Sequence, residues 1–226
     1  MTQVVPAIIP KTKEQMIEEI ERVSGFADRI QIDISDGLFT RTQTWPYNGK
    51  DTDYFGDLKA ESIGWPKWDN IDYEIHLMVQ SPEIVALDWI NSGVDTIIAH
   101  IEATPDFQNI VNICKKSEIS LGIAIMPGTD SEKIKPFIND VDFIQVMGSD
   151  KLGNHGAELE EKAKEMIRKL HDQYPEKMIA VDIGVSEETA EELVSLGATK
   201  LVSGSAIFEA VHPEDVYNYF KSISVK

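Results

Sequence analysis

The sequence contains little cysteine and no long apolar segment. Its one cysteine, Cys114, excludes an intramolecular disulfide and favours a reducing compartment. No apolar run approaches the ~18–20 residues that a membrane-spanning helix needs. Residues 1–15 have neither a basic start nor a long apolar core, so we expect no secretory signal. These absences predict a soluble, cytoplasmic protein.

Positive charge is also scarce. The 226 residues include 21 Lys and Arg against 39 Asp and Glu, so the net charge is 21 − 39 = −18. Nucleic acids and anionic membranes both need clustered positive charge, so we expect neither as a partner. An anionic substrate would have to be met locally, by backbone amides or helix ends.

Short runs rich in Val and Ile alternate with amphipathic segments along the whole chain. The runs are typical of strands buried on both faces, and they cover 4–9, 29–34, 71–79, 95–101, 119–125, 141–147, 178–183 and 199–204. Helical spacing of apolar residues covers 13–24, 82–93, 106–117, 131–140, 156–173, 186–197 and 213–223. This alternation predicts one (β/α)8 barrel domain over residues 1–226. A doubly wound open sheet is the alternative, and the absence of GxGxxG after the first strand disfavours its dinucleotide-binding form.

One stretch, at about 38–70, breaks this regularity as a long βα excursion. A short helix fits at 51–61, and the stretch carries the aromatic residues Trp45, Tyr47, Tyr54, Phe55, Trp65 and Trp68. Long βα loops often cover the active-site face of a barrel. The segment is therefore either a lid or subunit interface, or a surface excursion whose aromatic residues bury themselves. Barrels of this kind often associate, so a homo-oligomer would use these aromatic residues.

The residues at the strand ends are the candidates for chemistry, because barrel active sites lie at the carboxyl ends of the strands. These residues are Asp33 and Asp36, His76 and Met78, His100 and Glu102, Met147, and Asp182. Two carboxylates from different strands with a histidine between them could exchange protons on opposite faces of a substrate, which inverts a carbon next to a carbonyl. Taken singly, a strand-end Asp more often caps a turn, and we expect Asp36 to hold one with Gly37.

Glycine-rich helix starts follow the last three strands. They read GNHGAE at 153–158, IGVSEE at 183–188 and SGSAIF at 203–208. Amides at such starts form anion pockets, and phosphate sites in barrels commonly lie after strands seven and eight. We therefore expect a phosphate group to contact Gly153, His155, Gly156, Gly184, Gly204 and Ser205.

Blocks along nearly the whole chain resemble the ribulose-phosphate 3-epimerase family. They are DISDG (33–37), EIHLMV (74–79), HIEA (100–103), GIAIMPGT (122–129), VMGSDKLGNHG (146–156), VDIGVSEETA (181–190) and VSGSAIF (202–208). The resemblance implies a (β/α)8 barrel that interconverts D-ribulose 5-phosphate and D-xylulose 5-phosphate. It also implies that Asp33 and Asp182 serve as acid and base across an enediolate, with Met78 and Met147 packed over the reacting carbons.

The resemblance further implies a divalent metal (Zn, Fe, Mn or Mg) held by Asp33, His76 and Asp182. The family's second-strand histidine ligand is replaced by Gln31, its methionine by Ser35, and the glycine before Gly184 by Ile183. An amide oxygen is a weaker and harder ligand than imidazole, and it suits Zn²⁺ or Fe²⁺ less well. The set therefore predicts either a metal site completed by Gln31 or water, or a metal-free acid–base set.

Three functions remain open at this point. The leading hypothesis is an epimerase acting on a ketopentose phosphate or a near relative. The second is a non-catalytic protein that binds sugar phosphates. The third is a metal-independent isomerase or lyase acting on another phosphorylated substrate, in which Gln31 donates hydrogen bonds.

Overall fold

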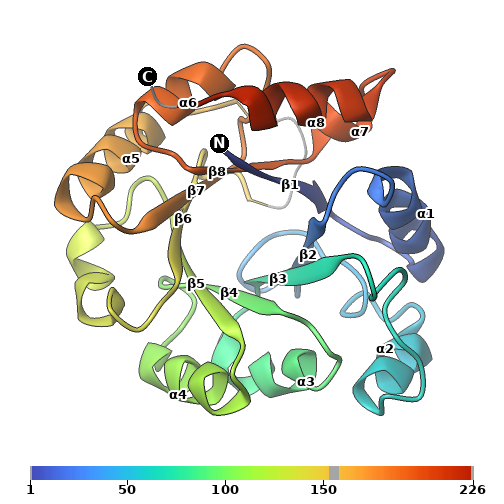
Figure 1. Ribbon diagram of the computed structural model, residues 1–226. Helices are drawn as coiled ribbons and strands as arrows, with labels where there is room; N and C mark the ends of the chain where they lie inside the picture. The colour runs from blue at the N-terminus through green and yellow to red at the C-terminus, as the bar shows by residue number, and fades with distance from the viewer. Residues whose placement is uncertain (1, 153–157, 225–226) are drawn as a thin grey trace.

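The computed structural model describes residues 2–152 and 158–224, in which eight parallel strands close into a barrel with helices around it (Figure 1). Each strand pairs with the next along the chain, and β8 closes on β1. The strands are β1 (Gln3–Ile8), β2 (Arg29–Ser35), β3 (Asp72–Met78), β4 (Thr96–His100), β5 (Ser120–Ile125), β6 (Phe143–Met147), β7 (Met178–Asp182) and β8 (Lys200–Ser203). The predicted (β/α)8 barrel is confirmed, and the open sheet is excluded.

The helices lie outside the strands and cover their outer faces (Figure 1). They are α1 (Lys13–Val23), α2 (Thr52–Lys59), α3 (Ala86–Ile90), α4 (Phe107–Ser117), α5 (Glu161–Gln173), α6 (Ala190–Ser195), α7 (Ser205–Phe208) and α8 (Pro213–Ser222). Helix α1 shows why they form: the Thr12 side chain caps its start, and Met16, Ile20 and Val23 bury one face at helical spacing.

Some predicted helices are shorter or tighter than their patterns indicate. Residues 131–140 form two 3₁₀ helices, η2 (Ser131–Lys133) and η3 (Lys135–Phe137), because Pro136 offers no N–H to an α-helix. The pattern at 82–93 divides into η1 (Pro82–Ile84) and α3. Helix α6 begins only at Ala190, after a turn in which the Ser186 N–H donates to Thr189 Oγ1 at 2.9 Å.

The aromatic residues of the 38–70 segment are mostly buried. Trp45 is 0% exposed and Trp65 is 3% exposed. Their rings form a T-shaped pair with 6.2 Å between centroids, and Trp45 also contacts Trp89. The short helix expected at 51–61 is present as α2. This packing supports the self-burying interpretation for those rings, whereas Trp68 remains 72% exposed. Phe39 does not join this aromatic cluster. Its ring contacts His100, with 4.9 Å between the centroids.

Within the described residues, none of the helices combines the length and apolar character that crossing a bilayer requires. The interior of the barrel is part apolar and part polar. Its apolar cluster contains Ile98, Ala124, Phe143, Met147 and Ala180. Fully buried polar side chains, among them Gln31, His76 and Gln145, share this interior. Buried polar groups need hydrogen-bond partners, and these three side chains find theirs at the mouth of the barrel.

Candidate active site

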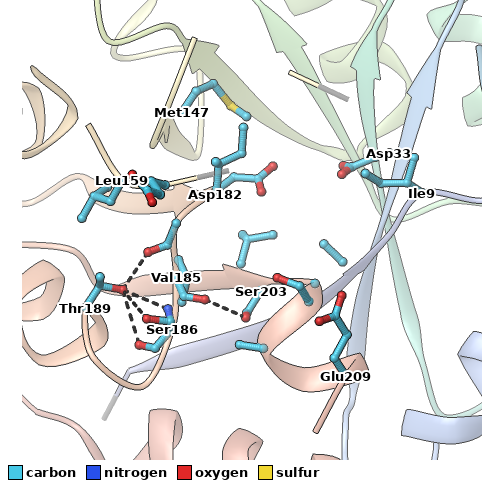
Figure 2. A pocket seen from close by; sticks show the side chains of 18 of the residues that line it. Ile9, Asp33, Met147, Leu159, Asp182, Val185, Ser186, Thr189, Ser203 and Glu209 are labelled. Carbon is cyan, nitrogen blue, oxygen red and sulfur yellow. Dashed lines mark hydrogen bonds between the residues drawn. The ribbon is translucent and has the colours of Figure 1, made fainter. Parts of the chain in front are cut away.

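Three predicted residues from different strands meet at the mouth of the barrel. The register of β2 against β3 sets Asp33 beside His76, and that of β6 against β7 sets Asp182 beside Met147. Nδ1 of His76 lies 3.0 Å from Asp33 Oδ1 and 3.3 Å from Asp182 Oδ2. Figure 2 shows the two carboxyl groups pointing toward one another across the pocket. The structure thus brings together the two carboxylates and the histidine.

Two glutamine amides hold the carboxyl groups. Nε2 of Gln31 donates to Asp33 Oδ1 at 2.7 Å and to Asp182 Oδ2 at 2.9 Å, and Nε2 of Gln145 donates to Asp182 Oδ2 at 3.1 Å. The Oε1 atoms of both amides are buried, with no hydrogen-bond partner among the described residues. Sequence reasoning missed Gln145. The available signal was a polar residue inside an apolar strand, two positions before Met147 and therefore on the same inward face.

The site holds a proton more tightly than isolated side chains would. Burial and the charge of Asp182 raise the pKa of Asp33. Burial alone would lower the pKa of His76, but hydrogen bonds to Asp182 and Asp33 outweigh it and raise that pKa to about 9. Two like charges sharing one imidazole are the kind of arrangement found at functional sites.

A cavity of about 660 Å³ opens above Asp33 and Asp182. Met78 and Met147 line it, and it extends to Gly184, Gly204 and Ser205, the residues expected to contact phosphate. Met147 and Asp182 appear at its wall in Figure 2. The other predicted phosphate contacts, Gly153, His155 and Gly156, lie outside the described residues.

The backbone beside Asp182 is unusual. Ile183 has φ of +80°, a conformation that is an outlier for a β-branched residue and is often stored at functional sites. Gly148 approaches it so closely that a Cβ there would lie 2.0 Å from the Ile183 carbonyl oxygen. The Gly148 N–H donates to the Asp182 carbonyl. This tight crossing holds the end of β7 against the end of β6.

Asp36 holds a turn as predicted. Its Oδ1 accepts from the N–H groups of Leu38 and Phe39 at 2.8 and 3.2 Å, and its Oδ2 accepts from the Gln80 N–H at 2.9 Å. Ser35, where the resembled family has methionine, is buried, and its hydroxyl lies 3.3 Å from that of Thr42. Neither residue lines the cavity.

The residues at the mouth also suit a divalent cation. One ligand atom from each of Asp33, His76 and Asp182 lies within 4.8 Å of the others. Nε2 of Gln31 contacts all three side chains, and its Oε1 has no hydrogen-bond partner among the described residues. Rotation about the last side-chain torsion would turn Oε1 toward the three side chains in place of Nε2. Carboxylate and amide oxygens with one imidazole are an ordinary donor set for such an ion.

A closed (β/α)8 barrel with paired carboxylates in a pocket at its mouth has the architecture of a barrel enzyme. The chain belongs to the ribulose-phosphate 3-epimerase family, whose model matches residues 3–208. This confirms the resemblance and the prediction of an epimerase-class enzyme.

Named relatives agree with this assignment, and a solved structure shares the fold. The chain is 29% identical over 217 residues to the ribulose-phosphate 3-epimerase of Bacillus subtilis, covering 92% of this chain and 93% of that protein. It is 25% identical to the enzyme of the same name from Schizosaccharomyces pombe, covering 99% and 94%. The fold is similar to that of 3-hexulose-6-phosphate synthase from Salmonella typhimurium, with a TM-score of 0.71, 16% identity, and coverage of 99% and 98%.

Proposed function

We propose that the protein inverts C3 of a ketose phosphate, interconverting D-ribulose 5-phosphate and D-xylulose 5-phosphate or a close relative of that pair. The observation that carries the proposal is the pair of carboxyl groups of Asp33 and Asp182, which come from different strands and face one another across the pocket. The named relatives of the chain support the same reaction.

The carboxyl pair supports proton transfer on both faces of C3. A proton next to a carbonyl is acidic enough for a positioned carboxylate to remove, and a carboxylic acid on the other face can return one. The raised pKa of Asp33 favours its protonated form, so in one direction Asp182 removes the proton and Asp33 supplies its replacement. The roles exchange in reverse. Gln31 and His76 hold both carboxyl groups in place, and Met78 and Met147 form an apolar wall.

The residues at the far end of the pocket support a phosphate-binding site there. Gly184, Gly204 and Ser205 line it, and Ser205 begins α7, where N–H groups are free of helical partners. Backbone amides can bind an anion even in a chain of net charge −18, and Lys164 also lines the pocket. A ketose phosphate bound with its phosphate here would extend its carbon chain toward the two carboxyl groups.

A divalent cation would be held by Asp33, His76 and Asp182, with Gln31 Oε1 as a fourth donor. Bound there, it would polarise the substrate carbonyl and favour loss of the neighbouring proton. The oxygen-rich donor set favours Mn²⁺ or Mg²⁺ over Zn²⁺. Replacing Gln31 by histidine is expected to shift the preference toward Zn²⁺, as measured by calorimetric titration.

A metal-independent isomerase is the second candidate, and one observation favours it. The NH₂ group of Gln31 and Nδ1 of His76 already contact both carboxyl groups, so the acid–base pair is held without a cation. Elemental analysis of protein purified without chelator, followed by activity measurements with and without added metal, separates the two candidates. Full activity of metal-free protein supports the second.

The decisive experiment is deuterium exchange. In D₂O the protein should exchange the C3 proton of ribulose 5-phosphate, followed by proton NMR, and the Asp33→Asn and Asp182→Asn variants should not. Absence of exchange with every ketose phosphate at high enzyme concentration would contradict the proposal. If phosphosugars still raised the melting temperature, a non-catalytic sugar-phosphate binder would be indicated instead.

A further inference from the structure

A line of hydrogen bonds leads from His76 to residues outside the pocket. Nε2 of His76 lies 2.9 Å from Nε2 of His100, and Nδ1 of His100 lies 3.2 Å from Oε2 of Glu102. Oε1 of Glu102 accepts a hydrogen bond from the Met126 N–H at 2.8 Å. Both rings are fully buried, with 5.0 Å between their centroids, and neither His100 nor Glu102 lines the cavity.

The contacts of Glu102 determine which nitrogen of His100 carries hydrogen. Burial would raise the pKa of Glu102, but its hydrogen bonds, led by that from His100, hold it below its usual range and keep the group ionised. An ionised carboxylate only accepts hydrogen bonds, so Nδ1 of His100 must donate. His100 is fully buried and faces one carboxylate, whereas the neighbouring His76 faces two, so a positive charge is placed better on His76 than on His100. A neutral His100 with hydrogen on Nδ1 has Nε2 as an acceptor.

The state of His76 follows from that of His100. Two ring nitrogens 2.9 Å apart need one hydrogen between them, and since Nε2 of His100 accepts, the hydrogen lies on Nε2 of His76. The opposite arrangement would turn the Nδ1 lone pair of His100 toward the Glu102 carboxylate at 3.2 Å, which is repulsive. Phe39 packs on His100 and helps to shield this line from water.

We propose that Glu102 and His100 are positioning residues that keep hydrogen on Nε2 of His76. Its Nδ1, which faces Asp33 and Asp182, is then the ring nitrogen that exchanges a proton or binds a divalent cation. The proposal rests on the proposed function for its kinetic consequence, but not for the arrangement of hydrogen atoms. Histidines that bind metals are commonly oriented in this way through the second ring nitrogen.

The direct test reads the hydrogen positions without any turnover. The chain has five histidines, so a long-range ¹H–¹⁵N correlation spectrum of [¹⁵N]histidine-labelled protein can be assigned with single His→Gln variants. Chelator-treated wild type should show hydrogen on Nε2 of His76 and on Nδ1 of His100, and Mg²⁺ should leave both in place. Hydrogen absent from Nε2 of His76 would overturn the proposal.

Variants then test whether the line matters for function. Glu102→Gln can turn an NH₂ group toward Nδ1 of His100, so it should move hydrogen off Nε2 of His76. Loss of such a partner typically lowers activity or metal affinity by about 10–100-fold. We expect this loss in kcat for C3 exchange with KM unchanged, because Glu102 does not line the pocket. The exposed Glu118→Gln is the matched control and should behave as wild type.

A second variant tests the same line of hydrogen bonds if Glu102→Gln folds poorly. His100→Phe keeps an aromatic ring between His76 and Phe39 but offers no acceptor, so it should lower kcat similarly. The double variant should be no worse than His100→Phe alone, because both changes act through one atom. Wild-type kcat and Mn²⁺ affinity in His100→Phe would overturn the proposal. If the wild type exchanges no substrate proton, the proposed function fails, and the spectra still decide the hydrogen positions.

Discussion

The two ends of the barrel interior bury charged side chains in opposite ways. At the N-terminal ends of the strands, Nζ of Lys200 contacts both carboxylate oxygens of Glu74 at 2.7 and 2.6 Å, and Arg29 reaches the same group at 3.0 Å. At the mouth, Asp33 and Asp182 share one imidazole and neutral amides. The lower end therefore balances each charge with its opposite, whereas the mouth sets two acidic groups against one imidazole, and these groups retain a proton.

The same strands supply both ends, so burial alone does not define a functional site. Glu74 and His76 are two residues apart on β3, and both are fully buried. A cluster in which every buried charge has an opposite partner contributes to the structure. A cluster with an excess of acidic groups retains a proton that can be transferred. The difference predicts that changes at the mouth affect catalysis and changes at the lower end affect stability.

The largest expected effect is at the mouth. Asp182→Asn removes a proton acceptor while preserving shape, and it should lower the rate of C3 exchange by about 10²–10⁴-fold. Deuterium exchange followed by NMR measures it. A rate within a few-fold of wild type would remove Asp182 from the proposed pair.

At the lower end, Lys200→Met should destabilise the protein by about 3–5 kcal/mol, because one partner of a buried ion pair is lost. The free energy of unfolding comes from urea titration. Exchange per folded molecule should stay unchanged, since Lys200 does not line the cavity. A catalytic loss matching that of Asp182→Asn would break the distinction between the two ends.

The mouth should also make stability depend on pH. The pKa of His76 rises from 6.5 unfolded to about 9 folded, so its contribution is complete below pH 6.5 and lost as pH rises through about 9. The raised pKa of Asp33 likewise makes the protein less stable as pH rises. Chelator-treated protein should lose up to roughly 3 kcal/mol over this window. His76→Gln should reduce the change of unfolding free energy with pH, measured by urea titration at several pH values. An unchanged pH dependence would mean that other groups cause it.

The smallest effect is expected at the edge of the lower cluster. Asp72 pairs with Arg29 at 2.6 Å, but its side chain is 52% exposed. Such pairs contribute about 0–1 kcal/mol because water screens them. Asp72→Asn should therefore change stability by less than about 1 kcal/mol and leave C3 exchange intact. A loss as large as that of Lys200→Met would mean that the whole cluster acts as one unit.

Much of the architecture could be predicted because it depends on local pattern. Strands buried on both faces read as short apolar runs, and the residues after them had to gather at one end of a parallel barrel. Asp33, His76 and Asp182 were located in this way. Residues 131–140 were mistaken for one helix because their apolar spacing is helical, although Pro136 prevents the bonds.

Contacts between distant strands could not be predicted. Lys200 and Glu74 are 126 residues apart, and nothing local marks them as partners. Gln145 was missed because only the pairing of β6 with β7 in the barrel sets it beside Asp182. Gln31 is a departure from the family pattern, but its contact with Asp182 depends on β2 and β7 facing one another inside the closed barrel.

The sequence by itself determined the eight buried strands, the residues that end them and the family to which the chain belongs. These follow from side-chain period and from motifs that lie within single βα units. Only the tertiary structure decided that Gln31 contacts both carboxyl groups and that His100 and Glu102 stand behind His76. The reason is physical: barrel closure and strand register determine which inward side chains meet, and no single segment encodes either.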